Sequence, residues 1–355
     1  AGLRLYLSTG ARSLEERRSF PVFNRFDDIV QQGIYALNDN WFLDLQGGVQ
    51  LNLDIAGFPY LKSVAAGVYE EVNLDYRYDE EVRSNDFDRE QVVLAYNKIR
   101  FDGGLRRYAV GVGLQFAGRL NLGLQAGFLS GDLQQERSIT FVGAEGQDVR
   151  ETGTHSLQNT PVVLSAGAIY EATPHLSLGA YVRLPYTVEY RFTGTTVSEP
   201  VAESIEYPLQ LTGGLEYRSR QELQARLNID VTYEWWSQTQ SAFVADYLSP
   251  PFEDAIRVKA GIEHIFHNKI PFRVGLQYRT TFQDRQRTRT LITAGTGFRD
   301  HRWQIDVAGG FSKLTYPFPD LFDDRLFGGD RSRSNIDDVS ERYFFGRVTL
   351  RVHVR

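Results

Sequence analysis

Several residue types and patterns that mark common protein classes are missing from this chain. Its 355 residues include no cysteine, which excludes disulfide bridges and thiolate metal sites. Methionine is absent even at the first position, so we expect that an export signal preceded this sequence and was removed. No stretch of about 18 or more apolar residues is present, which excludes a membrane-spanning helix. The net charge of −6 argues against a nucleic-acid partner.

Chemical motifs are also missing. We find no nucleophile–base motif and no phosphate-binding loop, so we expect no catalytic residue, no enzyme activity and no cofactor. The histidines show no metal-ligand spacing apart from the pair His264 and His267, and we expect no metal site. The acidic clusters Asp79–Glu81 and Asp320–Asp324 lack the fixed spacing of a calcium loop. Solvated charge is the expectation for both.

The dominant pattern is alternation of apolar and polar residues, which indicates β-strands with two unlike faces. Leu43, Leu45 and Val49 share one face of the first clear example. The stretch from His175 to Phe192 is predicted as one strand whose apolar face continues through Tyr186, Val188, Tyr190 and Phe192. Several strands run about ten residues or more, the length of a tilted bilayer crossing. Helical periodicity is confined to Asp88–Ile99, where a short loop helix is expected.

Short turns alternate with long connections along the chain. Short turns are predicted at Ala56–Pro59, Ala117–Asn121, Glu171–His175, Arg218–Glu222, Phe266–Pro271 and Arg299–Arg302, and long segments at Ser13–Asn40, Tyr78–Gly103, Ser130–Thr160 and Thr315–Arg342. This layout places all turns at one end of a barrel and all loops at the other, as in outer-membrane barrels. We therefore predict an all-β, transmembrane antiparallel barrel of about fourteen strands with periplasmic turns and extracellular loops. Residues 1–355 form a single domain in this prediction.

Three stretches resemble the FadL-like family of outer-membrane long-chain fatty-acid and hydrocarbon transporters. Leu178–Thr195 (LGAYVRLPYTVEYRFTGT) is similar to a family strand with an R-x-P core, and Leu227–Gln238 (LNIDVTYEWWSQ) is similar to a strand ending in tryptophan and serine. Ile256–Arg279 resembles the hairpin that follows. The resemblance implies passive uptake of hydrophobic molecules such as fatty acids. The family's N-terminal hatch is expected either to be missing or to lie outside this sequence, because the first strand is predicted to begin at Leu3.

A second function is open within the same resemblance. Barrels similar to the type 9 secretion shuttle PorV keep the fold and dock protein partners through their extracellular loops. The expected partners are therefore outer-membrane lipid and a hydrophobic small molecule, with protein partners at the loops as the alternative. The expected location is the bacterial outer membrane.

Charged residues gather on the polar face of the strands in the second half of the chain. They are candidates for binding a carboxylate headgroup or lining a polar lumen: Arg183, Glu189, Arg191, Arg226, Asp230, Glu234, Arg257, Lys259 and Glu263. The alternative is an interior network of ion pairs that stabilises a wide barrel, because buried charges need partners whatever the function.

The third strand contains one misfit. Val64, Ala66 and Val68 alternate regularly, and Val72, Leu74 and Tyr76 continue with the same parity. Glu70 would therefore face lipid, at a cost of a few kcal/mol near the bilayer midplane. A bulge at Tyr69, Glu70 and Glu71 would turn it inward, and in the resembled family a kink in this strand opens a side exit. The alternative is that Glu70 lies at headgroup level.

Aromatic residues are dense in the first and last long connections. Phe20, Phe23 and Phe26 precede the second strand, and Phe318 and Phe322 follow the penultimate one. Exposed apolar groups at this density indicate a groove that captures a ligand or a partner surface. The alternative is that these rings pack on each other and cap the barrel.

Overall fold

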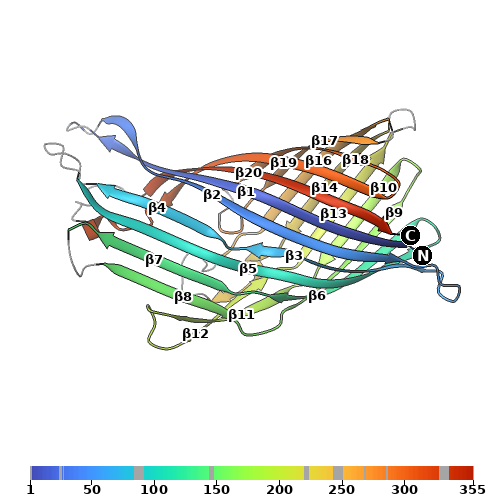
Figure 1. The fold of residues 1–355 in the computed structure, drawn as a ribbon, viewed down its shortest axis with the longest axis horizontal. Helices are drawn as coiled ribbons and strands as arrows, with labels where there is room; N and C mark the ends of the chain where they lie inside the picture. The colour runs from blue at the N-terminus through green and yellow to red at the C-terminus, as the bar shows by residue number, and fades with distance from the viewer. Residues whose placement is uncertain are drawn as a thin grey trace.

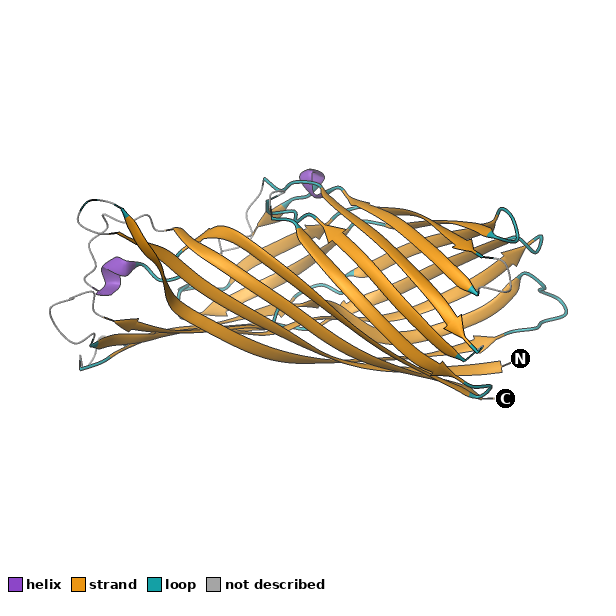
Figure 2. Ribbon diagram, turned by 90° about the horizontal axis from the view of Figure 1, so that it is seen from above, coloured by secondary structure: helices purple, strands orange, loops and turns teal. Residues whose placement is uncertain are grey.

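Antiparallel strands form one closed wall in the computed structural model of the protein (Figures 1 and 2). The structure describes residues 2–23, 26, 28–83, 92–143, 148–219, 224–242, 251–267, 269–284, 287–327 and 336–354. Across this described part of the chain the wall has fourteen strand positions, which confirms the predicted barrel.

Eight wall positions hold one uninterrupted strand each. These are β1 (Gly2–Phe23), β2 (Ile29–Asn52), β5 (Val93–Phe116), β16 (Ala255–Phe266), β17 (Ile270–Arg279), β18 (Arg289–Arg299), β19 (Trp303–Pro319) and β20 (Ile336–Val354). Six positions hold two consecutive strands. These are β3 (Leu61–Asn73) with β4 (Tyr76–Arg83), β6 (Leu120–Ser130) with β7 (Leu133–Phe141), β8 (Val149–Leu157) with β9 (Val162–Glu171), β10 (Leu176–Arg183) with β11 (Tyr186–Gly194), β12 (Val201–Tyr207) with β13 (Gln210–Arg218), and β14 (Ala225–Glu234) with β15 (Ser241–Ala242). Two short 3₁₀ helices, η1 (Trp236–Gln238) and η3 (Asp324–Phe327), lie in connections.

The barrel closes between its first and last strands. β1 pairs with β20 from Leu3↔Val354 to Ser19↔Asp338 and with β2 on its other side. Both termini lie at one end (Figure 1), which we call the turn end. The short connections at 53–60, 117–119, 172–175, 219–224, 267–269 and 300–302 return the chain at this end, as predicted.

The long connections differ from the prediction, because much of each is strand rather than loop. β1 continues to Phe23 and β2 already begins at Ile29. The helix expected at Asp88–Ile99 is also wrong where the chain is described, because Val93–Ile99 belongs to β5; residues 84–91 lie outside the described residues.

A line of breaks divides the wall on one side. The two-strand positions are interrupted at Leu74–Asp75, Gly131–Asp132, Gln158–Pro161, Leu184–Pro185, Pro208–Leu209 and 235–240. Proline offers no N–H to a ladder, which suits it to such breaks. Gly131, at φ 145°, lies so close to the neighbouring strand that an added Cβ would be 2.0 Å from the Gly104 carbonyl oxygen. Beyond the breaks β4, β7, β8, β11, β12 and β15 pair with one another and with the first half of β5. We call this second sheet the extension.

Apolar side chains cover the outer face of the barrel between the turn end and the breaks. Leu43 is 81% exposed, Val110 is 62% exposed and Ile292 is 58% exposed. Stacked rings lie near both limits of this band, Tyr60 with Phe116 toward the turn end and Tyr108 with Phe128 toward the breaks. An apolar band flanked by aromatic rings is typical of barrels that contact lipid. The described residues contain no helix long and apolar enough to cross a membrane.

Candidate functional site

The barrel wall loses its ladder along one edge of β3. β2 and β3 pair only from Asn52↔Ser63 to Gly47↔Val68. β3 continues to Asn73, and these last residues pair with β5 alone in the described structure. Farther along, side chains replace the ladder: Asn38 Oδ1 accepts from the Asp79 N–H at 2.7 Å, and Asn40 Nδ2 donates to the Arg77 carbonyl at 2.6 Å. β3 therefore has an unpaired edge between these two stretches.

A bulge lies in this edge, where the third-strand misfit predicts one. The β3–β5 register shifts between Glu70, opposite Arg106, and Val72, opposite Leu105, and leaves Glu71 without a partner in β5. An extra residue of this kind bends a strand and redirects side chains. The Glu70 carboxylate accepts from Arg12 Nη1 at 3.0 Å and from Asn73 Nδ2 at 2.6 Å. Arg12 lies on the lumen side of β1, so Glu70 is turned away from the lipid-facing surface.

The bulged residue joins a second ion-pair cluster in the lumen. Glu71 Oε1 lies 2.6 Å from Arg107 Nη2 and 3.4 Å from Arg183 Nη1, and Tyr186 donates to it at 3.4 Å. Arg107 also donates to the Tyr69 hydroxyl at 3.1 Å. Two guanidinium groups thus share one carboxylate, and the Nε atoms of both are buried without a hydrogen-bond partner among the described residues. The cluster carries a net positive charge with donors to spare.

An apolar cluster fills the lumen next to these charges. Its buried members are Leu105, Leu129, Val163, Tyr186, Val188, Tyr190, Ile205, Trp236, Phe252 and Ala255, and Val72, Leu157, Tyr207 and Phe282 pack against them. The Trp236 and Phe282 rings stack with centroids 4.1 Å apart. Val72 is the first β5-paired residue after the bulge, so the cluster begins where the wall loses its ladder.

Trp236 belongs to this cluster, which its place at a strand end in the sequence did not indicate. It is 4% exposed, and its Nε1 donates to Glu234 Oε2 at 2.9 Å. Glu234 is held in turn by Arg257 Nη2 at 3.1 Å. Both of these predicted lumen candidates therefore support the apolar cluster.

Beyond Pro185, the assignment of side chains to the two faces of the strand, as predicted from alternation, is wrong. Tyr186, Val188, Tyr190 and Phe192 are buried inside rather than facing lipid, and Tyr186 contacts the lumen carboxylate of Glu71. Glu189 and Arg191 consequently lie on the opposite, exposed face of β11, and neither is a lumen residue. The alternation is reset because the chain breaks at Leu184–Pro185 before β11 begins. Pro185 was the residue in the sequence that could have indicated this change of face.

Charged side chains line the lumen toward the turn end. Arg226, Asp230, Lys259 and Glu263 share a cavity of about 520 Å³. A neighbouring cavity of about 550 Å³ shares Arg226, Glu263 and Arg273 with it. Asp230 and Lys259 are directly opposite in the β14–β16 register. These candidates are thus brought together in neighbouring cavities, where Glu263 pairs with Arg273 and lies 3.9 Å from Arg226.

The aromatic residues predicted in the first and last long connections lie in different environments. Phe322 is 1% exposed, packs on Tyr78 with ring centroids 6.3 Å apart and lies under the Arg137 guanidinium. Phe318 lies beside Tyr316, and the Phe20 ring is 5.6 Å from that of Tyr35. Each of these three rings therefore lies against another aromatic ring in the described structure. Phe26 is 77% exposed, and the Phe23 side chain lies outside the described residues.

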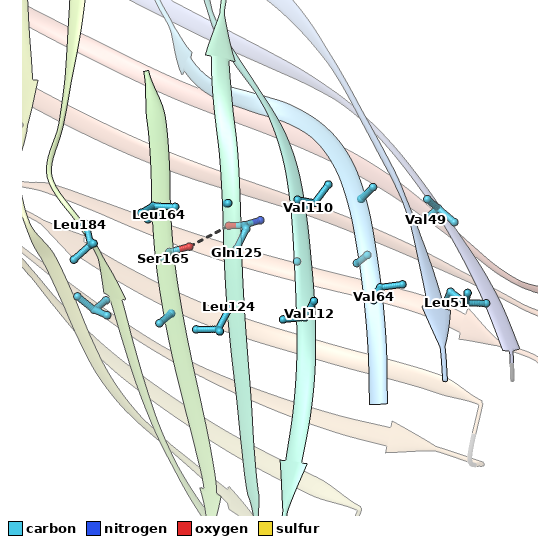
Figure 3. A pocket seen from close by; sticks show the side chains of 16 residues that line it. Val49, Leu51, Val64, Val110, Val112, Leu124, Gln125, Leu164, Ser165 and Leu184 are labelled. Atoms are coloured by element: carbon cyan, nitrogen blue, oxygen red, sulfur yellow. Dashed lines mark hydrogen bonds between the residues drawn. The ribbon is translucent and has the colours of Figure 1, made fainter. Parts of the chain in front are cut away.

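A hollow of about 800 Å³ marks the outer face of the wall beside β3 (Figure 3). Val49 and Leu51 of β2, Val64 of β3 and Val110 of β5 are among the apolar side chains that line it. Gln125 and Ser165, hydrogen-bonded at 3.2 Å, are also among its lining residues. The hollow includes Val64, Ala65 and Ala66 and so adjoins the last β2–β3 pairs before the unpaired edge.

No group of three or more His, Cys, Asp or Glu side chains in the described residues is arranged to hold a metal ion. The acidic residues near the bulge are instead neutralised by arginine, through Arg12 with Glu70 and Arg107 with Glu71.

Solved structures share this fold, although no family model matches the chain and no curated protein matches it. A Pseudomonas aeruginosa FadL homologue superposes with a TM-score of 0.64 at 11% identity, over 99% of this chain and 90% of that one. The Ralstonia pickettii toluene transporter TbuX gives 0.62 at 15% identity, and the P. putida toluene transporter TodX gives 0.57 at 14%; both matches cover 100% of this chain and 90% of theirs. The predicted resemblance is therefore confirmed for the fold: this chain has the fold of the FadL-like outer-membrane transporters.

Proposed function

We propose that this barrel lies in the bacterial outer membrane and takes up hydrophobic small molecules passively, releasing them sideways at the unpaired edge of β3. The observation that carries the proposal is the joint position of three features. The ladder between β2 and β3 ends at Gly47↔Val68, the bulge at Glu71 follows within three residues, and the apolar cluster starts at Val72. The structural neighbours named for toluene and FadL-type transport support this class of cargo.

The polarity of the lumen favours a sideways exit. An apolar molecule among Tyr186, Tyr207 and Trp236 is shielded from water by the cluster that surrounds it. The route toward the turn end leads past Lys259, Arg226 and other charged groups, where an apolar solute would displace hydration without replacing it. The route through the β3 edge leads to lipid, into which transfer is favourable. The apolar hollow on the outer wall beside this edge (Figure 3) suits a molecule that has just left the lumen.

The rim of the edge is polar and is held by ion pairs. Arg12 of β1 reaches Glu70 of β3 past the intervening β2, and Arg107 and Arg183 hold Glu71. These contacts keep both carboxylates inside and fix the bulge, which keeps the edge from continuing its pairing with β2. A cargo that bears a carboxylate would also meet the excess positive charge of this cluster at Arg183, whose side chain is 13% exposed. Fatty acids therefore fit this rim better than plain hydrocarbons do.

The alternative of a protein-docking scaffold has less support. The outward face of β11 presents the polar residues Thr187, Glu189 and Arg191, whereas protein interfaces need a desolvated apolar centre. The described part of this strand therefore provides no docking patch.

Cross-linking the edge tests the proposal, and the absence of native cysteine makes the test clean. If the β2–β3 register continued past Gly47↔Val68, Gln46 would face Tyr69. The variant Gln46→Cys/Tyr69→Cys should lose most uptake of labelled oleate into barrel-producing cells when oxidised, and regain it on reduction. The oxidised fraction is read from gel mobility.

The matched control is Gln50→Cys/Ala65→Cys, a pair that already faces each other in the ladder. Its oxidation should leave uptake unchanged. If oxidised Gln46→Cys/Tyr69→Cys still takes up oleate at the wild-type rate, the lateral exit is wrong. If the wild-type barrel gives no more uptake than cells without it, the transport function itself is wrong.

A further inference from the structure

An arginine-rich cavity lies in the lumen close to the turn end, away from the unpaired edge of β3. It measures about 550 Å³, and most of its lining side chains are charged. Its residues stand near strand ends that meet the short turns: Arg226 is the second residue of β14, Arg299 is the last of β18, and Arg351 lies three residues before the end of β20. The cavity therefore faces the aqueous compartment on the turn side.

The charges in this cavity do not balance. Four guanidinium groups, those of Arg226, Arg273, Arg299 and Arg351, share two carboxylates, those of Glu263 and Asp306. The excess is two positive charges. Guanidinium groups stay ionised under all ordinary conditions, so this excess cannot be removed by losing protons.

The carboxylates are already engaged by some of these arginines. Glu263 Oε2 accepts from Arg273 Nε at 2.6 Å and from Arg299 Nη2 at 3.0 Å. Asp306 Oδ1 accepts from Arg273 Nη1 at 2.7 Å. Arg273 is therefore the member of the set that pairs with both carboxylates.

The other three arginines keep donors unused. Arg226 comes no closer than 3.9 Å to Glu263, and among the described residues Arg299 makes one ion pair, from Nη2 to Glu263. Within the described residues Arg351 has no carboxylate within ion-pair distance, and its guanidinium lies over the Tyr6 ring at 5.7 Å. Unused N–H donors that converge on one cavity are the arrangement that binds oxyanions, because guanidinium N–H groups match oxyanion geometry.

We propose that this cavity is a binding site for a small, doubly charged oxyanion of the phosphate class, taken from the aqueous compartment at the turn end. The anion would match the excess of two positive charges and accept from Arg226, Arg299 and Arg351. The site is separate from the hydrophobic cargo route and does not depend on it. Its occupant is hydrated and ionic, whereas the cargo proposed above is apolar.

Isothermal titration of the purified barrel with inorganic phosphate tests the site. The titration is run in detergent micelles of no net charge at about pH 8, where phosphate is mostly a dianion. Total ionic strength is held constant with chloride, because surface charges are screened by salt. We expect saturable binding of one phosphate per barrel, with no such binding when chloride alone is varied. If phosphate does not bind the wild-type barrel, the proposal is wrong.

Two variants locate the binding. Arg226→Gln and Arg351→Gln should each weaken phosphate binding at least about tenfold, because each removes a charged donor. The matched control is Arg347→Gln, which removes one positive charge from the lumen face of the same strand as Arg351. Arg347 pairs with Asp44 at 2.9 Å and does not line the cavity. Folding of each variant is checked by the heat-dependent shift in gel mobility.

The control should bind phosphate within about twofold of wild type, less than the effect of losing one hydrogen bond. An equal loss in Arg347→Gln and Arg351→Gln would show a general effect of lumen charge and overturn the site. Displacement of phosphate by decanoate at constant ionic strength would assign these arginines to a cargo headgroup instead. That result would also overturn the proposal of a free oxyanion.

Discussion

Two neighbouring carboxylates, Glu70 and Glu71, lie at the edge of β3, and each is neutralised by a different arginine. Glu70 pairs with Arg12, whose side chain is 21% exposed, whereas Glu71 pairs with Arg107, whose side chain is 3% exposed. Water can solvate Arg12 if its partner is lost, but it cannot reach Arg107. Breaking the Glu71–Arg107 pair should therefore lower the free energy of unfolding more than breaking the Glu70–Arg12 pair, even though both ion pairs are short.

We predict that Glu71→Gln lowers the free energy of unfolding by about 3–5 kcal/mol, because it leaves the Arg107 charge buried and uncompensated. Glu70→Gln is the control and should cost about 1 kcal/mol or less, as expected for a partly exposed pair. Urea unfolding in lipid vesicles measures both. Equal losses in the two variants would contradict the burial difference.

A third carboxyl group, Glu80 of β4, lies in the extension beyond the membrane-spanning part. Burial raises its pKa to about 7, opposed by hydrogen bonds from Asn97 and Tyr78 and reinforced by the nearby charges of Asp320 and Asp337. Because the pKa in the folded state is above the usual value of 4.5, the folded state holds this proton more tightly than the unfolded state does. The stabilisation is complete below about pH 4.5 and is lost as the pH rises to about 7.

We therefore predict that the extension opens more readily at pH 8 than at pH 5, by an amount on the order of 2–3 kcal/mol. Hydrogen exchange of the β4 amides measures the opening. In Glu80→Gln the dependence over this range should be much smaller, because the neutral amide cannot titrate. Faster exchange at pH 5 than at pH 8, after correction for intrinsic rates, would contradict the assigned direction.

At the scale of the elements, the breaks decide which side chains face the lumen. β10 and β11 belong to one wall position, yet Leu178 is exposed on the outside of β10 while Val188 of the same parity is fully buried inside β11. The interruption at Leu184–Pro185 resets the phase between them. The apolar cluster exists because of this reset, which directs Tyr186, Val188 and Tyr190 inward.

Cysteine labelling tests the reset. With an impermeant maleimide on intact cells, Glu189→Cys should react, whereas Val188→Cys should not, because Val188 is fully buried. Gly57→Cys, in a turn-end connection, should react only after the outer membrane is made permeable. Reaction at position 188 but not at position 189 would restore the unbroken alternation and remove the cluster from the lumen.

At the scale of the whole molecule, the lumen is divided by chemistry along its length. The end next to the extension holds the apolar cluster, and the turn end holds the charged cavities. The wall has no ladder on one side of β3 beside Tyr69–Asn73. A hydrophobic molecule and an anion entering from opposite ends would thus each meet a surface suited to it. The proposed lateral exit would join the first of these surfaces to the outer apolar face.

Much of this architecture follows from the sequence alone. The strand period of two, the short returns such as the one near Gly57, and the count of strands depend on local alternation and turn chemistry. The misfit at Glu70 could be found in the same way, because one carboxylate among lipid-facing residues violates the pattern over a few positions. These features are local, so a single chain is enough to predict them.

Only the tertiary structure decided the partners and the faces beyond each break. Nothing in the sequence near Glu71 indicates Arg183, which lies 112 residues away and meets it only because the wall closes. Trp236 points inward and Glu189 and Arg191 point outward because of the backbone path at each break. Alternation before an interruption does not predict which face the residues after it occupy. The unpaired edge of β3 is likewise a property of two strands together. Ladder pairing depends on the path of β2 relative to β3, which neither strand specifies by itself.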